Sequence, residues 1–233
     1  MPAVAGARAR ARAEVQAAIT VEARRQLATE GAAALSLRAV ARELGMVSSG
    51  IYRYVASRDE LLTRLIIESY DSLGEAAERA AARSAGQAPA LRLQTVARAI
   101  RRWAVAQPHE WALLYGSPVP GYEAPADTIA PATRVSLALI SVVADALEAG
   151  DLAPLPPAAN LSKGLAKDLV GLREALEVDL PDELVIRLLA AWSQIFGLVS
   201  FELFGQTKNV IHDHAGLLDE TTARMSGLLG LPV

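Results

Sequence analysis

The chain has 233 residues, a formal net charge of −3 and no cysteine, so disulfides, thiolate zinc sites and cysteine nucleophiles are excluded. Hydrophobic residues make up 52% of it and aromatic residues only 5%, a mixture that favours an all-α fold over a β-sandwich. The sequence contains neither a secretory leader pattern nor an uncharged apolar run of about 18 residues. We therefore expect a cytoplasmic chain with no membrane partner.

Charge is distributed unevenly along the chain. Residues 1–64 hold ten arginines and six acidic residues, a charge of +4, whereas the remaining residues carry −7. A basic head on an acidic body indicates that the head binds a polyanion. Arginines on solvated helix faces would produce the same asymmetry. Arg8, Arg10 and Arg12 have two interpretations, an arm that enters a minor groove or a disordered tail.

The first predicted helix runs from about Arg12 to Glu30. Ile19, Ala23 and Leu27 are four residues apart, which places them on one helix face. Gly31 is positioned to stop the helix.

Two shorter helices are predicted next, separated by a tight turn. Ser36 is the expected N-cap of the first, in which apolar residues recur at helical spacing up to Leu44, and Gly45 ends it. The second covers residues 48–54, with Ser48 as its expected N-cap. This arrangement is a helix-turn-helix, whose second helix enters a DNA major groove. We expect residues 1–56 to form an N-terminal three-helix DNA-binding domain.

Three short motifs follow one another across this region. They are Ala-x-Glu-Leu-Gly at residues 41–45, a Tyr-x-Tyr pair at residues 52–54 and Ser-x-x-Glu at residues 57–60. In this order and spacing they resemble the DNA-binding signature of the TetR family, over roughly residues 12–65. Val55 departs from the pattern, since the family usually has Phe there, but it remains apolar. The resemblance implies a homodimeric transcriptional repressor that binds a palindromic DNA operator and is released by a small-molecule effector.

Candidate DNA-binding residues follow from the helix-turn-helix and from the resemblance. Small side chains at the start of the third helix would let the backbone approach base edges. The resemblance implies that Tyr52 and Tyr54 touch a DNA phosphate or pack beneath it. The alternative for Tyr54 is that it is a residue of the apolar core. Ser36 and Arg58 lie at the N-termini of predicted helices, where a phosphate is favoured. The alternative for Arg58 is that it is a solvent-exposed residue of the capping turn with no DNA contact. The candidates are Ser36, Ser48, Ser49, Gly50, Tyr52, Arg53, Tyr54 and Arg58.

Residues 57–233 are expected to form a larger helical ligand-binding and dimerisation domain. Ser57 and Glu60 predict a capping box at the start of a bridging helix, residues 57–83, which would be roughly 40 Å long. Further helices are predicted over residues 89–106, 109–115, 130–148, 161–176, 182–204 and 213–229.

The body also carries a weaker resemblance. Residues 109–125 and 202–205, with Trp192 and Gly197, are similar to the C-terminal domain of a TetR subgroup named for its Trp-His-Gly residues. Aromatic walls with a few polar tips suit an apolar effector, although each such residue has a core role as its alternative. The predicted effector-binding residues are Trp103, Trp111, Tyr115, Tyr122, Val143 and Trp192.

Residues 182–204 carry two apolar stripes, which need two packing partners. One partner is the domain core, and the other is a second copy of the chain in a symmetric four-helix interface. The alternative is that both stripes pack within one chain. The predicted interface residues are Ile195, Phe196, Val199, Leu203, Leu218, Met225 and Leu229.

An enzyme is the main rival interpretation. The sequence has no phosphate-binding loop, dinucleotide fingerprint, nucleophile elbow or His-Glu-x-x-His motif. Its three histidines are His109, His212 and His214, and a metal pair at the last two would need further ligands. We predict no enzymatic activity, cofactor or metal. An architectural DNA-binding protein without a ligand, or an activator, remains the alternative to a repressor.

Overall fold

The computed structural model describes residues 2–155 and 160–232, and within them the chain is all-helical, with no strand. It contains two compact units. The first comprises residues 1–69 and 107–129, and the second comprises residues 70–106 and 130–233. Each unit is built from segments that are separated in the sequence.

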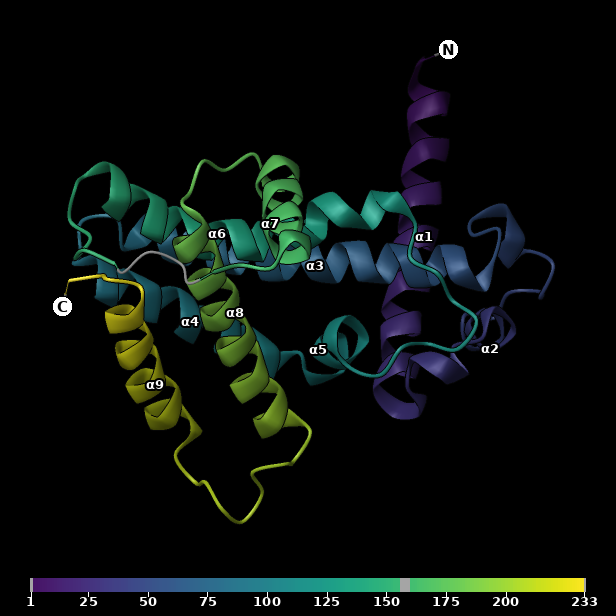
Figure 1. Cartoon of the computed structure of the whole chain (residues 1–233). Helices are drawn as coiled ribbons and strands as arrows, with labels where there is room; N and C mark the ends of the chain where they lie inside the picture. Colours follow the sequence, from purple (N-terminus) through teal and green to yellow (C-terminus); the bar gives the residue numbers. More distant parts are fainter. Residues whose placement is uncertain (1, 156–159, 233) are drawn as a thin grey trace. The chain divides into compact units, whose positions relative to one another are not determined.

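The α-helices are labelled in Figure 1. In the first unit the elements are α1 (Pro2–Glu30), η1 (Ala32–Ala34), α2 (Leu37–Glu43), η2 (Ile51–Arg53), the start of α3 (Arg58–Arg83), α5 (Pro108–Tyr115) and η3 (Ala126–Thr128). In the second unit they are the rest of α3, α4 (Pro89–Ala106), α6 (Ile129–Glu148), α7 (Lys163–Leu176), α8 (Asp182–Leu203) and α9 (His214–Leu228).

The first unit has its own apolar core. Ile19 and Ala23 of α1, Val40 of α2, Ile51 of η2 and Leu61 of α3 are fully buried there. We expected a division between residues 56 and 57, but this unit also takes the beginning of α3 and all of α5. Their apolar side chains, which the sequence pattern assigned to the body, complete the core of the first unit.

The second unit is a bundle in which α4, α8 and α9 pack against one another and α7 packs against α8. Charged pairs tie these helices together at their polar edges. Arg101 of α4 forms a two-pronged ion pair with Glu202 of α8, with N···O distances of 2.7 and 2.6 Å. Arg98, one turn earlier on α4, makes the same kind of pair with Asp219 of α9.

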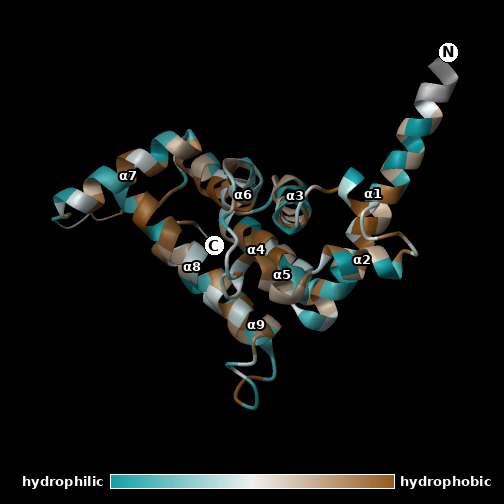
Figure 2. Cartoon of the chain, turned by 90° about the vertical axis from the view of Figure 1, so that its right-hand side faces the viewer, coloured by the Kyte–Doolittle hydropathy of each residue, from teal (hydrophilic) through white to brown (hydrophobic). Residues whose placement is uncertain are grey.

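Helix positions agree closely with the sequence prediction. Helix α4 has the predicted bounds, and the predicted ends of α3, α6, α8 and α9 lie within one residue of the observed ones. The largest difference is the start of α1, which begins at Pro2 rather than near Arg12. The alternating Ala-Arg segment is therefore helical, and neither an extended arm nor an unstructured tail describes it. In Figure 2, hydrophilic and apolar residues alternate along it.

Two helical segments, Ala126–Glu148 and Asp182–Leu203, are long and apolar enough to span a membrane by length and composition alone. Both carry charged residues that are paired within the protein. Arg134 binds Glu78 of α3, and Arg187 binds Glu183 one turn away on α8. Their most apolar faces supply buried residues such as Val142 and Ile195. These features match core helices of a helical bundle.

Candidate nucleic-acid interface

The turn of the helix-turn-helix begins where α2 ends. Gly45 has a φ of 64°, a left-handed conformation that glycine adopts without steric cost. The Met46 amide donates to the Ala41 carbonyl at 2.8 Å, and the Gly45 amide donates to the Arg42 carbonyl at 3.1 Å. This pair of bonds is a Schellman motif, which ends the helix and reverses the chain direction. The glycine predicted to end α2 does so.

The segment after this turn is helical but shorter than predicted. Residues 48–50 form a turn and Ile51–Arg53 form a 3-10 helix, in place of an α-helix over residues 48–54. Ile51 and Val55 are fully buried and anchor the segment to the core of the first unit. Ser48, Ser49, Tyr52 and Arg53 are exposed on its outer side. Four candidate DNA-binding residues of this short segment are therefore accessible to a partner.

The start of this segment differs from the prediction in a second way. The N-cap of η2 is Gly50 rather than Ser48, and it makes no side-chain capping hydrogen bond. The Gly50 amide instead donates to the Val47 carbonyl at 2.7 Å. A Cβ added at Gly50 would lie 3.0 Å from that same oxygen, which leaves little room for a larger residue. Glycine here thus serves the tight turn itself.

Ser36 is the N-cap of α2, as predicted. Its hydroxyl accepts a hydrogen bond from the Ala39 amide, at 3.4 Å. Its own amide donates to the side chain of Gln26, which is buried beneath α2. Ser36 is half-buried, so its hydroxyl serves the cap in the free protein.

Arg58 has a structural role in this unit. Its guanidinium donates to the carbonyls of Leu35, Ala32 and Ala33, at 3.1, 3.1 and 3.2 Å. These carbonyls lie in and just after η1, in the connection between α1 and α2. The residue therefore ties the start of α3 to that connection, which the sequence pattern did not reveal.

Tyr54, for which we expected either a phosphate contact or a core position, is partly in the core and partly accessible. It is half-buried and packs against the core of the first unit. The guanidinium carbon of Arg12 lies 5.4 Å from the centre of its ring, within the range of a cation–π interaction. The exposed arginine is thereby held beside the candidate interface. The helical spacing of Arg8 and Arg12 was the signal in the sequence that could have placed both on one face of an extended α1.

The six predicted effector-binding residues are divided between the two units, three in each. Trp111 is fully buried in the first unit, with its ring 4.5 Å from that of Tyr115, and the Tyr122 hydroxyl shares a 2.9 Å hydrogen bond with Thr63. The other three belong to the second unit. There Trp103 donates from Nε1 to Ser72 at 2.9 Å, Val143 is fully buried and Trp192 contacts Phe196.

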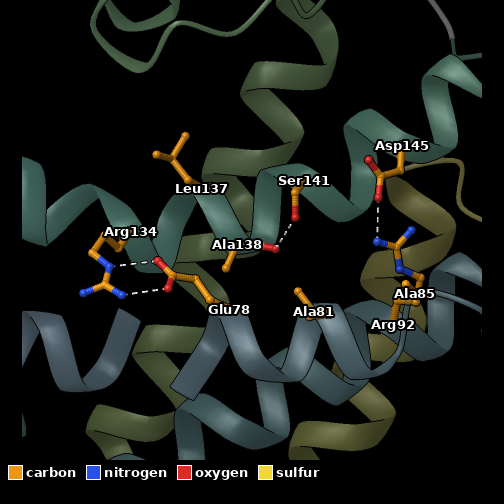
Figure 3. A pocket seen from close by; sticks show the side chains of 10 residues that line it. Glu78, Ala81, Ala85, Arg92, Arg134, Leu137, Ala138, Ser141 and Asp145 are labelled. Carbon is orange, nitrogen blue, oxygen red and sulfur yellow. Dashed lines mark hydrogen bonds and ion pairs between the residues drawn. The ribbon is translucent and has the colours of Figure 1, made fainter. Parts of the chain in front are cut away.

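A cavity of about 460 Å³ lies in the second unit between α3, α4 and α6 (Figure 3). It is lined by Glu78, Ala81, Ala82, Ala85, Arg92, Arg134, Leu137, Ala138, Ser141 and Asp145, and by none of the six predicted residues. The pairing of Arg134 with Glu78 at 2.8 and 2.7 Å holds the pKa of that carboxyl below its usual range. Alanines, rather than the aromatic residues singled out in the sequence, provide the open space.

The predicted dimer residues are mostly core. Six of the seven are buried within a single chain, and only Leu203 is half-exposed. The apolar residues that α8 leaves exposed are different ones. They are Leu189, Trp192 and Phe201, followed by Phe204 just after the helix.

Comparisons with known proteins agree with this architecture. Residues 19–65 match the family model for bacterial regulatory proteins of the tetR family, and residues 93–225 match a tetracyclin repressor-like C-terminal domain. These matches do not bear on the predicted Trp-His-Gly subgroup.

The chain is 43% identical to the HTH-type transcriptional regulator Rv1816 of Mycobacterium tuberculosis, over 86% of both chains. The crystal structure of SCO4313, described as a regulatory protein, is 36% identical, with a TM-score of 0.73 over 95% of this chain and 98% of that one. RolR, solved in complex with resorcinol, shares the fold at 12% identity, with a TM-score of 0.52 over 97% of both chains. The chain therefore belongs to the tetR family of bacterial regulatory proteins and is a transcriptional regulator of the helix-turn-helix type.

Proposed function

We propose that the protein is a repressor that binds a palindromic DNA operator as a homodimer and releases it when a small molecule binds its second unit. The observation that carries this proposal is the segment after α2. Its buried residues Ile51 and Val55 fix it to the first unit, while Ser48, Ser49, Tyr52 and Arg53 face outward together.

This surface combines the two kinds of contact that operator recognition requires. The serines are small enough to let the backbone approach base edges in a major groove. Tyr52, Arg53 and the nearby Arg12 supply groups that bind phosphate and set the position of the protein on the duplex. Because only a few side chains can distinguish bases, we expect a large, salt-dependent contribution of phosphate contacts to affinity.

Selection of bound duplexes from a random library tests operator recognition. We expect an enriched sequence with two inverted half-sites about one helical turn apart. Ser49→Ala should alter the preferred bases, whereas Ser162→Ala, at the N-cap of α7 in the second unit, should not. A protein that enriches no duplex at moderate salt would refute the proposal.

The exposed apolar face of α8 supports a homodimer. Leu189 and Phe201 are 39% and 50% exposed, and no charged residue lies between them. Burial of such residues against a second copy is favourable, and two DNA-binding units on one two-fold axis match a palindrome. We therefore assign the interface to this face of α8 rather than to Ile195 and Val199.

Light scattering on variant proteins tests this interface. Phe201→Glu should shift the protein from dimer to monomer, because the new charge would be buried without a partner. Val21→Glu is the control, since Val21 is an apolar residue on α1 of the first unit that is 66% exposed, compared with 50% for Phe201. A Phe201→Glu variant that remains a dimer would move the interface elsewhere.

Helix α3 offers a route for the effector response, because one continuous helix contributes residues to both units. RolR, which has the same fold, was solved with a bound small molecule. A ligand that favours one position of α3 would shift the equilibrium between DNA-binding and released states. Spin labels on the two DNA-binding units of a dimer should show a different separation when the ligand is bound than when it is absent. If the separation and the mobility of the labels are the same in both states, this mechanism is excluded.

A further inference from the structure

The cavity between α3, α4 and α6 has an apolar middle and a charged pair at each end. Ala81 of α3 lies opposite Ala138 of α6 across the middle, as Figure 3 shows, and Leu137 of α6 also lines the cavity. Arg134 with Glu78 closes one end, and Arg92 with Asp145 lies at the other. Its volume, about 460 Å³, is within the range of pockets that hold small organic ligands.

Arg92 is unusual among the charged residues of this cavity. It is only 8% exposed, and its Nε atom is buried without a hydrogen-bond partner among the described residues. Its one ion pair there is a contact of 2.6 Å between Nη2 and a single oxygen of Asp145. A buried donor left unpaired is costly, so a ligand that supplies acceptors to this guanidinium gains binding energy.

Other arginines of the second unit are better satisfied. Arg98, Arg101 and Arg134 each bind a carboxylate through two nitrogens. Arg92 is on α4 together with Arg98 and Arg101, but it binds its carboxylate through one nitrogen only. Its partner Asp145 has a side chain that is 54% exposed and can therefore be released to solvent at low cost.

We propose that this cavity binds a small carboxylic acid with an apolar body, in its ionised form. Both oxygens of the ligand carboxylate accept hydrogen bonds from the guanidinium of Arg92 and displace Asp145. A planar carboxylate that binds through two oxygens is the strongest type of partner for an arginine. The apolar body lies over the alanines of α3 and against Leu137. This assignment rests on the proposed function, for which it names the chemical class of the effector.

Calorimetric titration of the full-length protein without DNA tests the site. Octanoate and phenylacetate are the probes, and octanamide and phenylacetamide are their uncharged counterparts. We expect the acids to bind at least about tenfold more tightly than the amides, since a charge-assisted pair would be lost with the amides. Arg92→Gln should weaken acid binding by a similar factor, and Arg92→Lys, which keeps the charge but not the fork, by less.

Two further variants sharpen the test. Asp145→Asn should tighten acid binding by about two- to fivefold, because the displaced competitor is then uncharged. Arg98→Gln removes a carboxylate pair from the same helix outside the cavity and should leave acid binding unchanged. It also shows how much stability such a loss costs, so that a folding defect in Arg92→Gln is recognised from its melting curve.

The proposal is overturned if neither acid binds, if acids and amides bind equally, or if Arg92→Lys and Arg92→Gln bind the acids like the unmodified protein. Weaker binding in Asp145→Asn would also overturn it, because Asp145 would then be a ligand contact. Any of these results with intact operator binding leaves the repressor assignment standing. Tight acid binding without DNA release instead supports the site and refutes the effector response.

Discussion

Arg24 of α1 lies against Glu110 of α5, with 3.0 Å between its Nε atom and Glu110 Oε1. The same guanidinium donates to Glu68 of α3 at 2.9 Å, and Ser69 donates to the other oxygen of Glu110 at 3.2 Å. Three helices of the first unit thus meet at one arginine. This cluster therefore holds α5 within the first unit, although α5 is separated from α1 and the start of α3 in the sequence.

Glu110→Gln should lower the melting temperature more than Glu68→Gln. The Glu110 side chain is 12% exposed and that of Glu68 is 39% exposed, so solvent screens the Glu68 pair more strongly. We expect a loss of about 1.5–3 kcal/mol for Glu110→Gln and about 0–1 kcal/mol for Glu68→Gln. Thermal unfolding of the two variants measures the difference, and equal losses would mean that the two carboxylates contribute equally and that burial of Glu110 adds nothing.

Arg58→Ala is expected to destabilise the free protein by about 1–3 kcal/mol, because three backbone carbonyls lose their charged donor. Affinity for operator and random duplexes should fall together as a secondary effect. Arg53→Ala is the matched control for stability: Arg53 is exposed on η2, so this variant should melt like the unmodified protein although it loses a proposed phosphate contact. If Arg58→Ala melts like the unmodified protein but loses DNA with a flatter salt dependence, Arg58 binds phosphate, as first predicted from the sequence.

Arg12→Gln should weaken binding to all duplexes by a similar factor. Arg12 lies over the ring of Tyr54 next to the proposed interface, where it can contact phosphate without reading a base. We expect the slope of log affinity against log salt to fall in magnitude by about 1, measured by fluorescence anisotropy. Arg224→Gln on α9 should leave the slope unchanged. A change in the preferred sequence would instead assign Arg12 to base recognition.

Most helices could be predicted from the sequence because their ends are encoded locally. Ser57 accepts from the Glu60 amide at 3.0 Å and begins α3, as its motif predicts. The Glu60 carboxylate completes the cap, although it accepts from the Ala56 amide rather than from that of Ser57. Asp213 likewise caps α9 by accepting from the Gly216 amide. Such signals depend on residues three or four apart and survive in any tertiary arrangement.

Packing partners could not be predicted in the same way. Phe196 and Val199 are apolar on an apolar helix, and periodicity alone does not say which neighbour covers them. The chain's own bundle buries both, and Phe201 is left exposed. The cavity was missed because alanine is ordinary in helices, and its small volume creates space only where a second helix faces it. Arg92 carried no sequence signal either, since its burial depends on α6.

The charged clamp between α3 and α6 should make stability depend on pH. Arg134 binds Glu78 and also Asp71, and its Cβ and Cδ atoms pack against Gly74, where an added Cβ would lie 2.7 Å from the Arg134 Cβ. The hydrogen bonds from Arg134 lower the pKa of Glu78 from its ordinary value of 4.5. Since the folded pKa is the lower one, the pair contributes its full stability above about pH 4.5 and loses it as the pH falls through the folded value.

Glu78→Gln should therefore be less stable than the unmodified protein at neutral pH, and the difference in melting temperature should shrink steadily below about pH 4.5. Other carboxylates titrate in both proteins, so the difference between the two isolates Glu78. Glu75→Gln provides the control, because Glu75 pairs with Arg79 on the exposed side of the same helix and a screened pair contributes little. A difference that stays constant with pH would mean that the amide and the carboxylate hold Arg134 equally well, and that packing against Gly74 rather than charge joins α3 to α6.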